Sequence, residues 1–140
     1  MPMKGRKAHI ARLRKLASPA SLMLIDKALF AGGESIQVEA QLSIAAGAVS
    51  GKDHVPSKPG EPPNADTHQL SDGIITRRTR FLTVEVASTA PHAGIEFDWG
   101  NVAARPYMRP ARDKMKPQVI RDVEKALNIA VRQSRSTGAG

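Results

Sequence analysis

Histidine and aspartate side chains outside the patterned segments are the first candidates for chemistry in this chain of 140 residues. Three histidines have aspartates nearby: His54, His68 and His92, with Asp53, Asp66 and Asp72. No two of these histidines have the i, i+4 spacing that places both imidazoles on one helical face, and no metal-binding signature surrounds them. The chain has no cysteine, so thiolate ligands and thiolate nucleophiles are excluded. We therefore expect no bound metal and no other cofactor.

A serine nucleophile is not supported by the motifs either. Ser71, His92 and an aspartate are the residue types of a catalytic triad, but almost any chain of this length contains such a set. The sequence has no Gly-x-Ser-x-Gly elbow and no glycine-rich phosphate loop. The two glycines of "AGGES" fall inside a helical pattern, where they indicate a close contact between elements. The sequence therefore predicts a protein that is not an enzyme.

The charge distribution favours a binding role. The formal net charge is +8, six basic residues precede the first acidic residue, Asp26, and a second basic run follows Arg105. Such surfaces attract polyanions or acidic protein surfaces, although they also serve simply as solubilising faces. A small basic nucleic-acid-binding protein is therefore an alternative function. Against it, the five aromatic residues offer no large stacking platform, and no recognition-helix signature is present.

Helical spacing of apolar residues predicts two helices at the N-terminal end. Residues 1–17 are a basic segment with Ile10, Leu13 and Leu16 on one side of a short helix. Ser18 and Pro19 are typical of an N-cap and a first helical position, so a second helix should begin there. The following stretch "IQVEAQLSI" is ambiguous, because its strict alternation is typical of a strand while its composition favours a helix.

A proline-rich segment, residues 51–72, divides the chain in the middle. It contains "PSKPGEPPNADTHQL", which has four prolines and few apolar residues that could join a core. We predict an extended arm, because proline reduces the entropy that an extended segment loses when it becomes ordered on a partner. A mobile lid or a tolerated flexible insertion would fit the same composition.

Strand and helix patterns follow the proline-rich segment. "GIITRR" and "TRFLTVEVAS" predict paired strands with Leu82, Val84 and Val86 on the buried face, and "AGIEFDWG" predicts a third strand. Apolar residues between positions 119 and 131 predict a last helix, which Pro117 should start or kink. Residues 134–140 should be a frayed tail. No apolar run suits a membrane span or a secretory signal, so we expect cytoplasmic synthesis and no membrane partner.

Two motifs, taken in order, carry a resemblance to a known family. The first is "PGEPPNADT" followed by Leu70, and the second is "ARPYMRPA", residues 104–111, preceded by "HAGIEFDWG". With a strand pair between them, they resemble the tail-completion or head–tail joining proteins of tailed phages, a family that also occurs in gene transfer agents. His68 stands where the family has a turn glycine, and histidine is among the residues that tolerate positive φ. Trp99 lies in "FDWG", where the family has Glu-Phe-Gly.

The resemblance implies a single domain over residues 1–140 with an α+β fold. An antiparallel sheet of three or four strands would pack against a long N-terminal helix and a C-terminal helix, with a long Pro-rich loop between elements. The family has a long helix before this loop, so we interpret residues 36–44 as helical despite their alternating pattern.

The resemblance also implies a structural virion protein. Copies would assemble in the host bacterial cytoplasm into a ring, sixfold by analogy, at the head-proximal end of a phage or phage-like tail. The ring would terminate the tail tube or join it to the neck. Its partners would be other copies of the chain, a neck or head-completion protein (a stopper or adaptor) and the tail-tube protein. DNA would pass through the ring without specific recognition.

Residues of both motifs are candidates for contacts between subunits. Arg105 and Arg109 carry forked guanidinium groups that suit carboxylates of a neighbour. Tyr107 and Met108 are apolar enough to plug a neighbouring subunit, or alternatively to seal this subunit's own sheet. The expected interface set comprises Pro59, Glu61, Pro62, Pro63, Trp99, Arg105, Tyr107, Met108 and Arg109.

Overall fold

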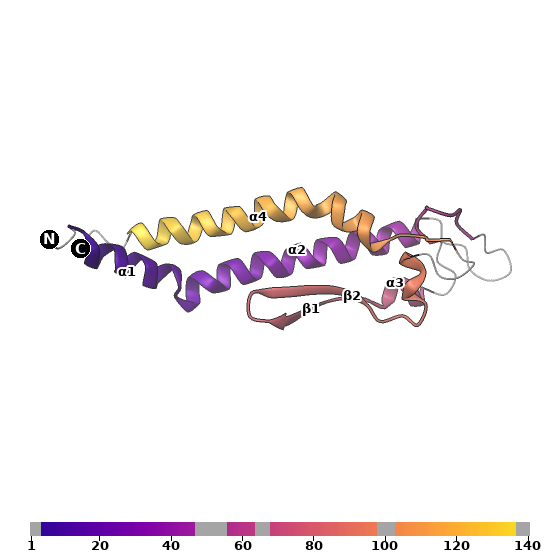
Figure 1. Ribbon diagram of the computed structural model, residues 1–140, viewed down its shortest axis with the longest axis horizontal. Coiled ribbons are helices and arrows are strands. Elements are labelled where there is room, and N and C mark those ends of the chain that lie inside the picture. Colours follow the sequence, from indigo (N-terminus) through magenta and orange to yellow (C-terminus); the bar gives the residue numbers. More distant parts are fainter. Residues whose placement is uncertain (1–3, 47–55, 64–67, 98–102, 137–140) are drawn as a thin grey trace.

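The computed structural model describes residues 4–46, 56–63, 68–97 and 103–136. Within these ranges the fold is α+β, with four α-helices and a two-stranded antiparallel sheet. Figure 1 shows an elongated molecule in which a long helix, α2, lies between helix α4 and a β-hairpin. The expected α+β class is confirmed, whereas the described sheet is smaller than the three or four strands expected.

Two helices form the N-terminal third, as the apolar spacing predicted. Helix α1, Arg6–Leu16, is followed by α2, Pro19–Ala45, which has Ser18 as its N-cap. The Ser18 hydroxyl oxygen accepts a hydrogen bond from the Ser21 amide at 3.4 Å. Helix α2 includes the ambiguous stretch, so its helical interpretation is confirmed. Ala40 and Ile44, one turn apart, are both fully buried, and burial of that helical face explains why the alternating pattern does not produce a strand.

Two adjacent glycines allow α2 to pack closely on opposite sides. A Cβ atom on Gly32 would lie 2.7 Å from Cγ1 of Val119 in α4, and one on Gly33 would lie 2.7 Å from Cγ2 of Thr76 in the hairpin. Both distances are too short for carbon atoms in van der Waals contact. The close contact expected at "AGGES" is therefore confirmed, and each glycine serves a different neighbour.

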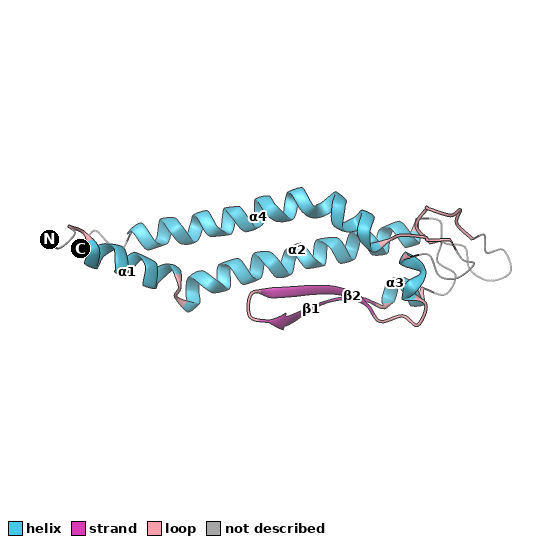
Figure 2. Cartoon of the chain, viewed as in Figure 1, coloured by secondary structure: helices cyan, strands magenta, loops and turns pink. Residues whose placement is uncertain are grey.

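The hairpin consists of β1, Ile74–Arg80, and β2, Thr83–Ser88, which pair antiparallel. Both strands were predicted. Leu82, expected in a strand, instead lies in the turn between them with a φ of 55°. Figure 2 shows the hairpin along the side of α2 that faces away from α4. Polar groups fasten it there: Arg78 Nε donates to Asp26 Oδ2 at 2.8 Å, and Thr76 Oγ1 donates to Gln37 Oε1 at 2.7 Å.

The predicted third strand is wrong over its described part. Residues Ala93–Glu96 form a 3₁₀ helix, η2, in which the Ile95 amide donates to the His92 carbonyl at 3.2 Å. The alternating pattern is misleading because Glu96 is buried to cap another helix, as described below, and so does not belong to a wet sheet face. The end of the predicted strand, with Trp99, lies outside the described residues.

The Pro-rich segment, predicted as an extended arm over residues 51–72, is described in two parts, 56–63 and 68–72. Residues 56–63 contain no regular secondary structure, but Gln69–Asp72 form a short helix, α3, so the prediction of an arm reaching residue 72 is wrong at its end. Leu70 of this helix packs in the core, and its residue surface is only 6% exposed. His68, before α3, has a φ of 61°, so the positive φ expected at this turn is confirmed. Residues 51–55 and 64–67 of the predicted arm lie outside the described residues.

The last helix, α4, spans Met108–Ser136. Pro117 lies inside it and does not start it. Along its orange portion in Figure 1 the helix changes direction, as expected for an internal proline that removes a backbone donor. Ser134 is helical and buried, so the prediction of a frayed tail is wrong for residues 134–136, and residues 137–140 lie outside the described part. None of the described helices is long and apolar enough to cross a membrane.

Candidate subunit interface and its scaffold

The Arg-Pro-Tyr-Met-Arg-Pro turn begins α4, and a carboxylate from a distant residue caps it. Glu96 Oε2 accepts from the amides of Tyr107 at 2.7 Å and Met108 at 2.9 Å, and its Oε1 accepts from the Arg109 amide at 2.9 Å. The next residue, Pro110, has no N–H. The amides at a helix start normally need partners outside the helix, and here one carboxylate and one proline account for all of them.

Hydrogen bonding controls the ionisation of Glu96. Burial of the carboxyl group, which is 5% exposed as a residue, by itself raises its pKa. The three backbone donors and the Arg109 side chain outweigh that effect, so the pKa of Glu96 is lowered below its ordinary value. The positive end of the α4 dipole lies at the same place and favours the charged form as well. Glu96 is therefore a buried anion with a structural function in this subunit.

Tyr107 belongs to the subunit's own core. It is 1% exposed and packs in a cluster with Ala40, Ile44 and Leu70. Its hydroxyl donates to the Ala93 carbonyl at 3.1 Å, which joins η2 to the start of α4. Burial raises the pKa of Tyr107, and the charge of Glu96 adds to that rise. Of the two roles open to Tyr107 in the sequence, the structure shows the sealing role.

Arg109 has partners within its own chain. Its Nε donates to Glu96 Oε1 at 3.1 Å, one terminal nitrogen donates to the Glu96 carbonyl at 3.1 Å, and its guanidinium lies 4.8 Å from the centre of the Phe97 ring. The side chain nevertheless remains 48% exposed. Phe97 is 59% exposed, so this arginine and phenylalanine together present a flat surface to the outside.

Arg105 and Ala104 connect the Pro-rich segment to the residues before α4. Its Nε donates to the Ser57 carbonyl at 3.2 Å, and the Gly60 amide donates to the Ala104 carbonyl at 2.8 Å. Pro63 is buried and Pro62 half-buried, whereas Pro59 and Glu61 are exposed. Residues of both motifs thus meet through the hydrogen bond between Gly60 and Ala104, and within the Pro-rich segment Pro59 and Glu61 are the described members of the set that remain exposed.

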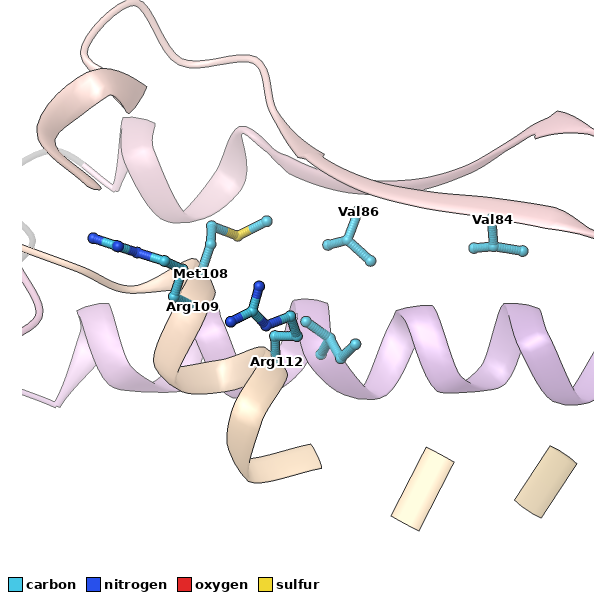
Figure 3. Close-up of a pocket in the computed structure, with 6 residues that line it drawn as sticks. Val84, Val86, Met108, Arg109 and Arg112 are labelled. Carbon is cyan, nitrogen blue, oxygen red and sulfur yellow. The ribbon is translucent and has the colours of Figure 1, made fainter. Parts of the chain in front are cut away.

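An open groove lies beside the turn, between the hairpin and the first turns of α4 (Figure 3). It has a volume of about 320 Å³ and is lined by Ile36, Val84, Val86, Met108, Arg109 and Arg112. Figure 3 shows the Met108 side chain extending toward Val86, while the Arg109 side chain points to the other side of the helix. Met108 is half-buried here, so it lines a surface and does not protrude from it.

Large apolar side chains are exposed along both long helices. Val38 and Leu42 of α2 are 51% and 59% exposed, and their spacing of four residues places them on one face. Ile120 and Leu127 of α4 are 46% and 42% exposed, and a spacing of seven places them on one face as well. None of these four residues belongs to the interface set expected from the sequence, although helical spacing alone places each pair on one face.

Glu96 is the functional side chain that the sequence reading missed. Its partner amides lie eleven to thirteen positions further along the chain, so no local capping pattern identifies it. The described residues contain no group of three or more histidine or acidic side chains that could hold a metal ion. Comparison of the chain with protein-family models, with curated proteins and with solved structures found no match.

Proposed function

We propose that the chain is a structural subunit of a ring at the head-proximal end of a phage or phage-like tail, where the ring terminates the tail tube or joins it to the neck. The ordered motifs at residues 59–70 and 104–111 support this proposal through their resemblance to the tail-completion and head–tail joining family. One hydrogen bond joins the two motifs directly, from the Gly60 amide to the Ala104 carbonyl, and Arg105 binds the Ser57 carbonyl just before the first motif.

The exposed apolar surface is the observation that supports self-assembly. A single subunit fully buries only three large side chains among its described residues: Ile44, Ile74 and Tyr107. At the same time, large apolar residues along α2 and α4 are more than one third exposed. Exposed apolar side chains that share one helical face, as Val38 and Leu42 do, are candidates for an interaction surface. Copies that pack side by side through the long helices would cover it.

The candidate contact residues divide between scaffold and surface. Tyr107 and Glu96 hold the turn in shape and Pro63 is buried, while Pro59, Glu61 and the exposed part of Arg109 are available to a neighbour or to a neck protein. Met108 would contribute through the groove that it lines. Trp99 and Arg105 remain proposed interface residues, the second with part of its donor capacity already used on Ser57.

Sedimentation velocity and negative-stain electron microscopy of the purified chain test the proposal. We expect a concentration-dependent transition to closed rings of uniform rotational symmetry, sixfold if the resemblance holds. A strictly monomeric protein at all accessible concentrations would contradict it. Position is tested separately by immunogold labelling of tailed particles from the source organism: label at the junction of head and tail supports the proposal, and label elsewhere or none on intact particles opposes it.

A further inference from the structure

The net positive charge of the molecule is concentrated at one end. Residues 4–25 contain six basic and no acidic side chains, and residues 125–136 contain Lys125, Arg132 and Arg135 and again no acidic side chain. These nine charges exceed the formal net charge of +8 for the whole chain, so the remainder is close to neutral. We call the two segments together the basic pole.

The fold brings the two segments of the basic pole together. Helix α1 packs against α4, and Figure 1 shows α1 beside the last turns of α4. Arg6, Lys7, Arg12 and Arg14 are exposed, as are Arg132 and Arg135. None of the four exposed basic residues of α1 takes part in an ion pair within the described residues. The pole is therefore a cationic surface that α1 and the last turns of α4 form together.

The arrangement of these charges favours a dense polyanion. The basic residues of α1 are distributed around the helix and do not form one stripe along it. A folded acidic protein would contact only one continuous face of the helix, so this distribution disfavours such a partner. An anionic membrane is disfavoured because only Ile10, Leu13 and Leu16 are large and apolar in α1, and two of these three are partly covered by the subunit. No aromatic residue occurs in either segment, so single-stranded nucleic acid would find nothing to stack on.

We propose that the basic pole binds the phosphate backbone of double-stranded DNA without sequence preference. Lysine and arginine gain affinity by releasing counterions from the duplex, and this attraction needs charge density more than a defined docking face. The pole does not resemble a helix that reads bases in the major groove. Its basic residues are interspersed with small residues, and no two asparagine or glutamine residues lie on one helical face, from which they could bind adenine. The inference does not depend on the ring, because a single subunit already carries the complete pole.

Fluorescence anisotropy with labelled duplexes of two unrelated sequences provides the test. The wild-type chain should bind both equally, and its affinity should fall by on the order of 10³ between about 50 and 200 mM salt if some six phosphates are contacted. The variant Arg6→Glu with Lys7→Glu should bind roughly tenfold or more weakly at the lower salt concentration. Acidic residues in the first turn of a helix are favourable, so α1 should persist, which circular dichroism can verify.

A matched control separates the pole from net charge. Lys116→Glu with Arg121→Glu makes the same change in net charge on exposed positions in the middle part of α4, and it should weaken binding less than about threefold. Equal losses in the two variants would overturn the proposal, as would a salt-independent affinity or a strong preference for one sequence. Vesicles containing phosphatidylglycerol serve as the competing probe, and binding to them without binding to duplex DNA would replace the proposal with a membrane surface.

Discussion

The side chain of Glu96 determines the backbone geometry of the turn that begins α4. The Arg-Pro-Tyr-Met-Arg-Pro turn owes its shape to a carboxylate that satisfies three successive amides and to prolines that need no partner. Arg109 closes the arrangement by binding both the carboxylate and the carbonyl of Glu96. Arg105 and Arg109 thus both bind groups of their own chain. Only the part of each guanidinium that these groups leave exposed could contact a neighbouring subunit.

Acid should weaken the fold through Glu96. Its pKa is lowered in the folded state, so its stabilising contribution is complete above the unfolded-state pKa, near 4.5, and is lost as the pH falls through the lower folded-state pKa. Glu96→Gln should reduce the free energy of unfolding at neutral pH by about 1–3 kcal/mol, because charge-assisted hydrogen bonds become neutral ones. It should also flatten the pH dependence below pH 4.5. Urea titrations of both proteins at several pH values measure these effects.

The control for this prediction is Glu61→Gln. Glu61 is exposed, and its carboxylate accepts a hydrogen bond from the Lys58 amide at 3.3 Å. We expect Glu61→Gln to change the free energy of unfolding by less than about 0.5 kcal/mol. If Glu96→Gln and Glu61→Gln behave alike, Glu96 does not act as the cap described here.

At the scale of elements, α2 is the layer on which the other elements are placed. Gly32 admits α4 on one side and Gly33 admits the hairpin on the other, so one pair of glycines determines how closely three elements approach. Long-range polar contacts then hold the layers: Asp26 with Arg78 on the hairpin side, and Glu39 with Lys114 at 2.6 Å on the α4 side. Glycine would ordinarily weaken the middle of a helix, so its presence here reflects the space that packing requires.

A double-mutant cycle tests the approach of α4 to α2. Gly32→Ala should destabilise the chain by about 1–3 kcal/mol, because its methyl group meets Val119 Cγ1 at 2.7 Å and this cost exceeds the gain of about 1 kcal/mol in helix propensity. Combined with Val119→Ala, the same substitution should be largely tolerated, which gives a favourable coupling energy of about 1 kcal/mol or more. Thermal or urea unfolding of the four proteins measures it.

Gly33→Ala supplies the matched comparison. Its methyl group would meet Thr76 and Val84 in the hairpin and would not approach Val119. We therefore expect Gly33→Ala to destabilise the chain without coupling to Val119→Ala. Similar coupling for both glycines would show that the two layers do not pack independently on α2.

The whole molecule is elongated and uneven in character. The basic pole lies at one end, where α1 packs on the last turns of α4. The buried core, which includes Leu70 of α3 and Tyr107 at the start of α4, lies toward the other end. Exposed apolar residues occur along α2 and α4 between these ends. These three regions suit three tasks: attraction to a polyanion, a stable fold, and lateral association of copies. The proposed ring uses the middle region, and the proposed DNA contact uses the pole.

Lateral association should depend on the exposed face of α2. Val38→Lys with Leu42→Lys removes two large apolar groups that the subunit itself leaves more than half exposed, so the monomer should keep its melting temperature within a few degrees. Self-association measured by sedimentation should weaken at least tenfold, because two buried charges would replace apolar contacts in the assembly.

Gln118→Lys with Asn128→Lys is the charge-matched control on α4. Both positions are exposed and polar, so the substitutions add the same two charges without removing apolar surface. Self-association should persist in this variant apart from a modest electrostatic weakening. Loss of association in the control but not in the α2 variant would place the interface on α4 instead.

Local patterns were sufficient for most of the elements. Ser18 and Pro19 predicted the start of α2, the alternation of apolar and polar residues from 82 to 87 predicted the second strand of the hairpin, and the paired glycines predicted a close contact. Each of these features depends on neighbours along the chain. The positive φ of His68 followed from the resemblance, because the family has a turn glycine at this position. Stretches 36–44 and 93–96 could not be settled by period alone, because burial by distant elements decides whether an alternating segment becomes helix or strand.

By itself, the sequence determined the long helices at both ends of the chain, the hairpin between them, the excess of basic residues and the absence of cysteine chemistry. Only the tertiary structure decided that Glu96 caps α4, that Tyr107 is a core residue, that Arg105 and Arg109 bind their own chain, and that the two basic segments form one pole. The physical reason is the range of the interactions. Helix propensity, capping and alternation act between near neighbours, whereas burial and hydrogen-bond partners depend on which distant segments the fold brings together.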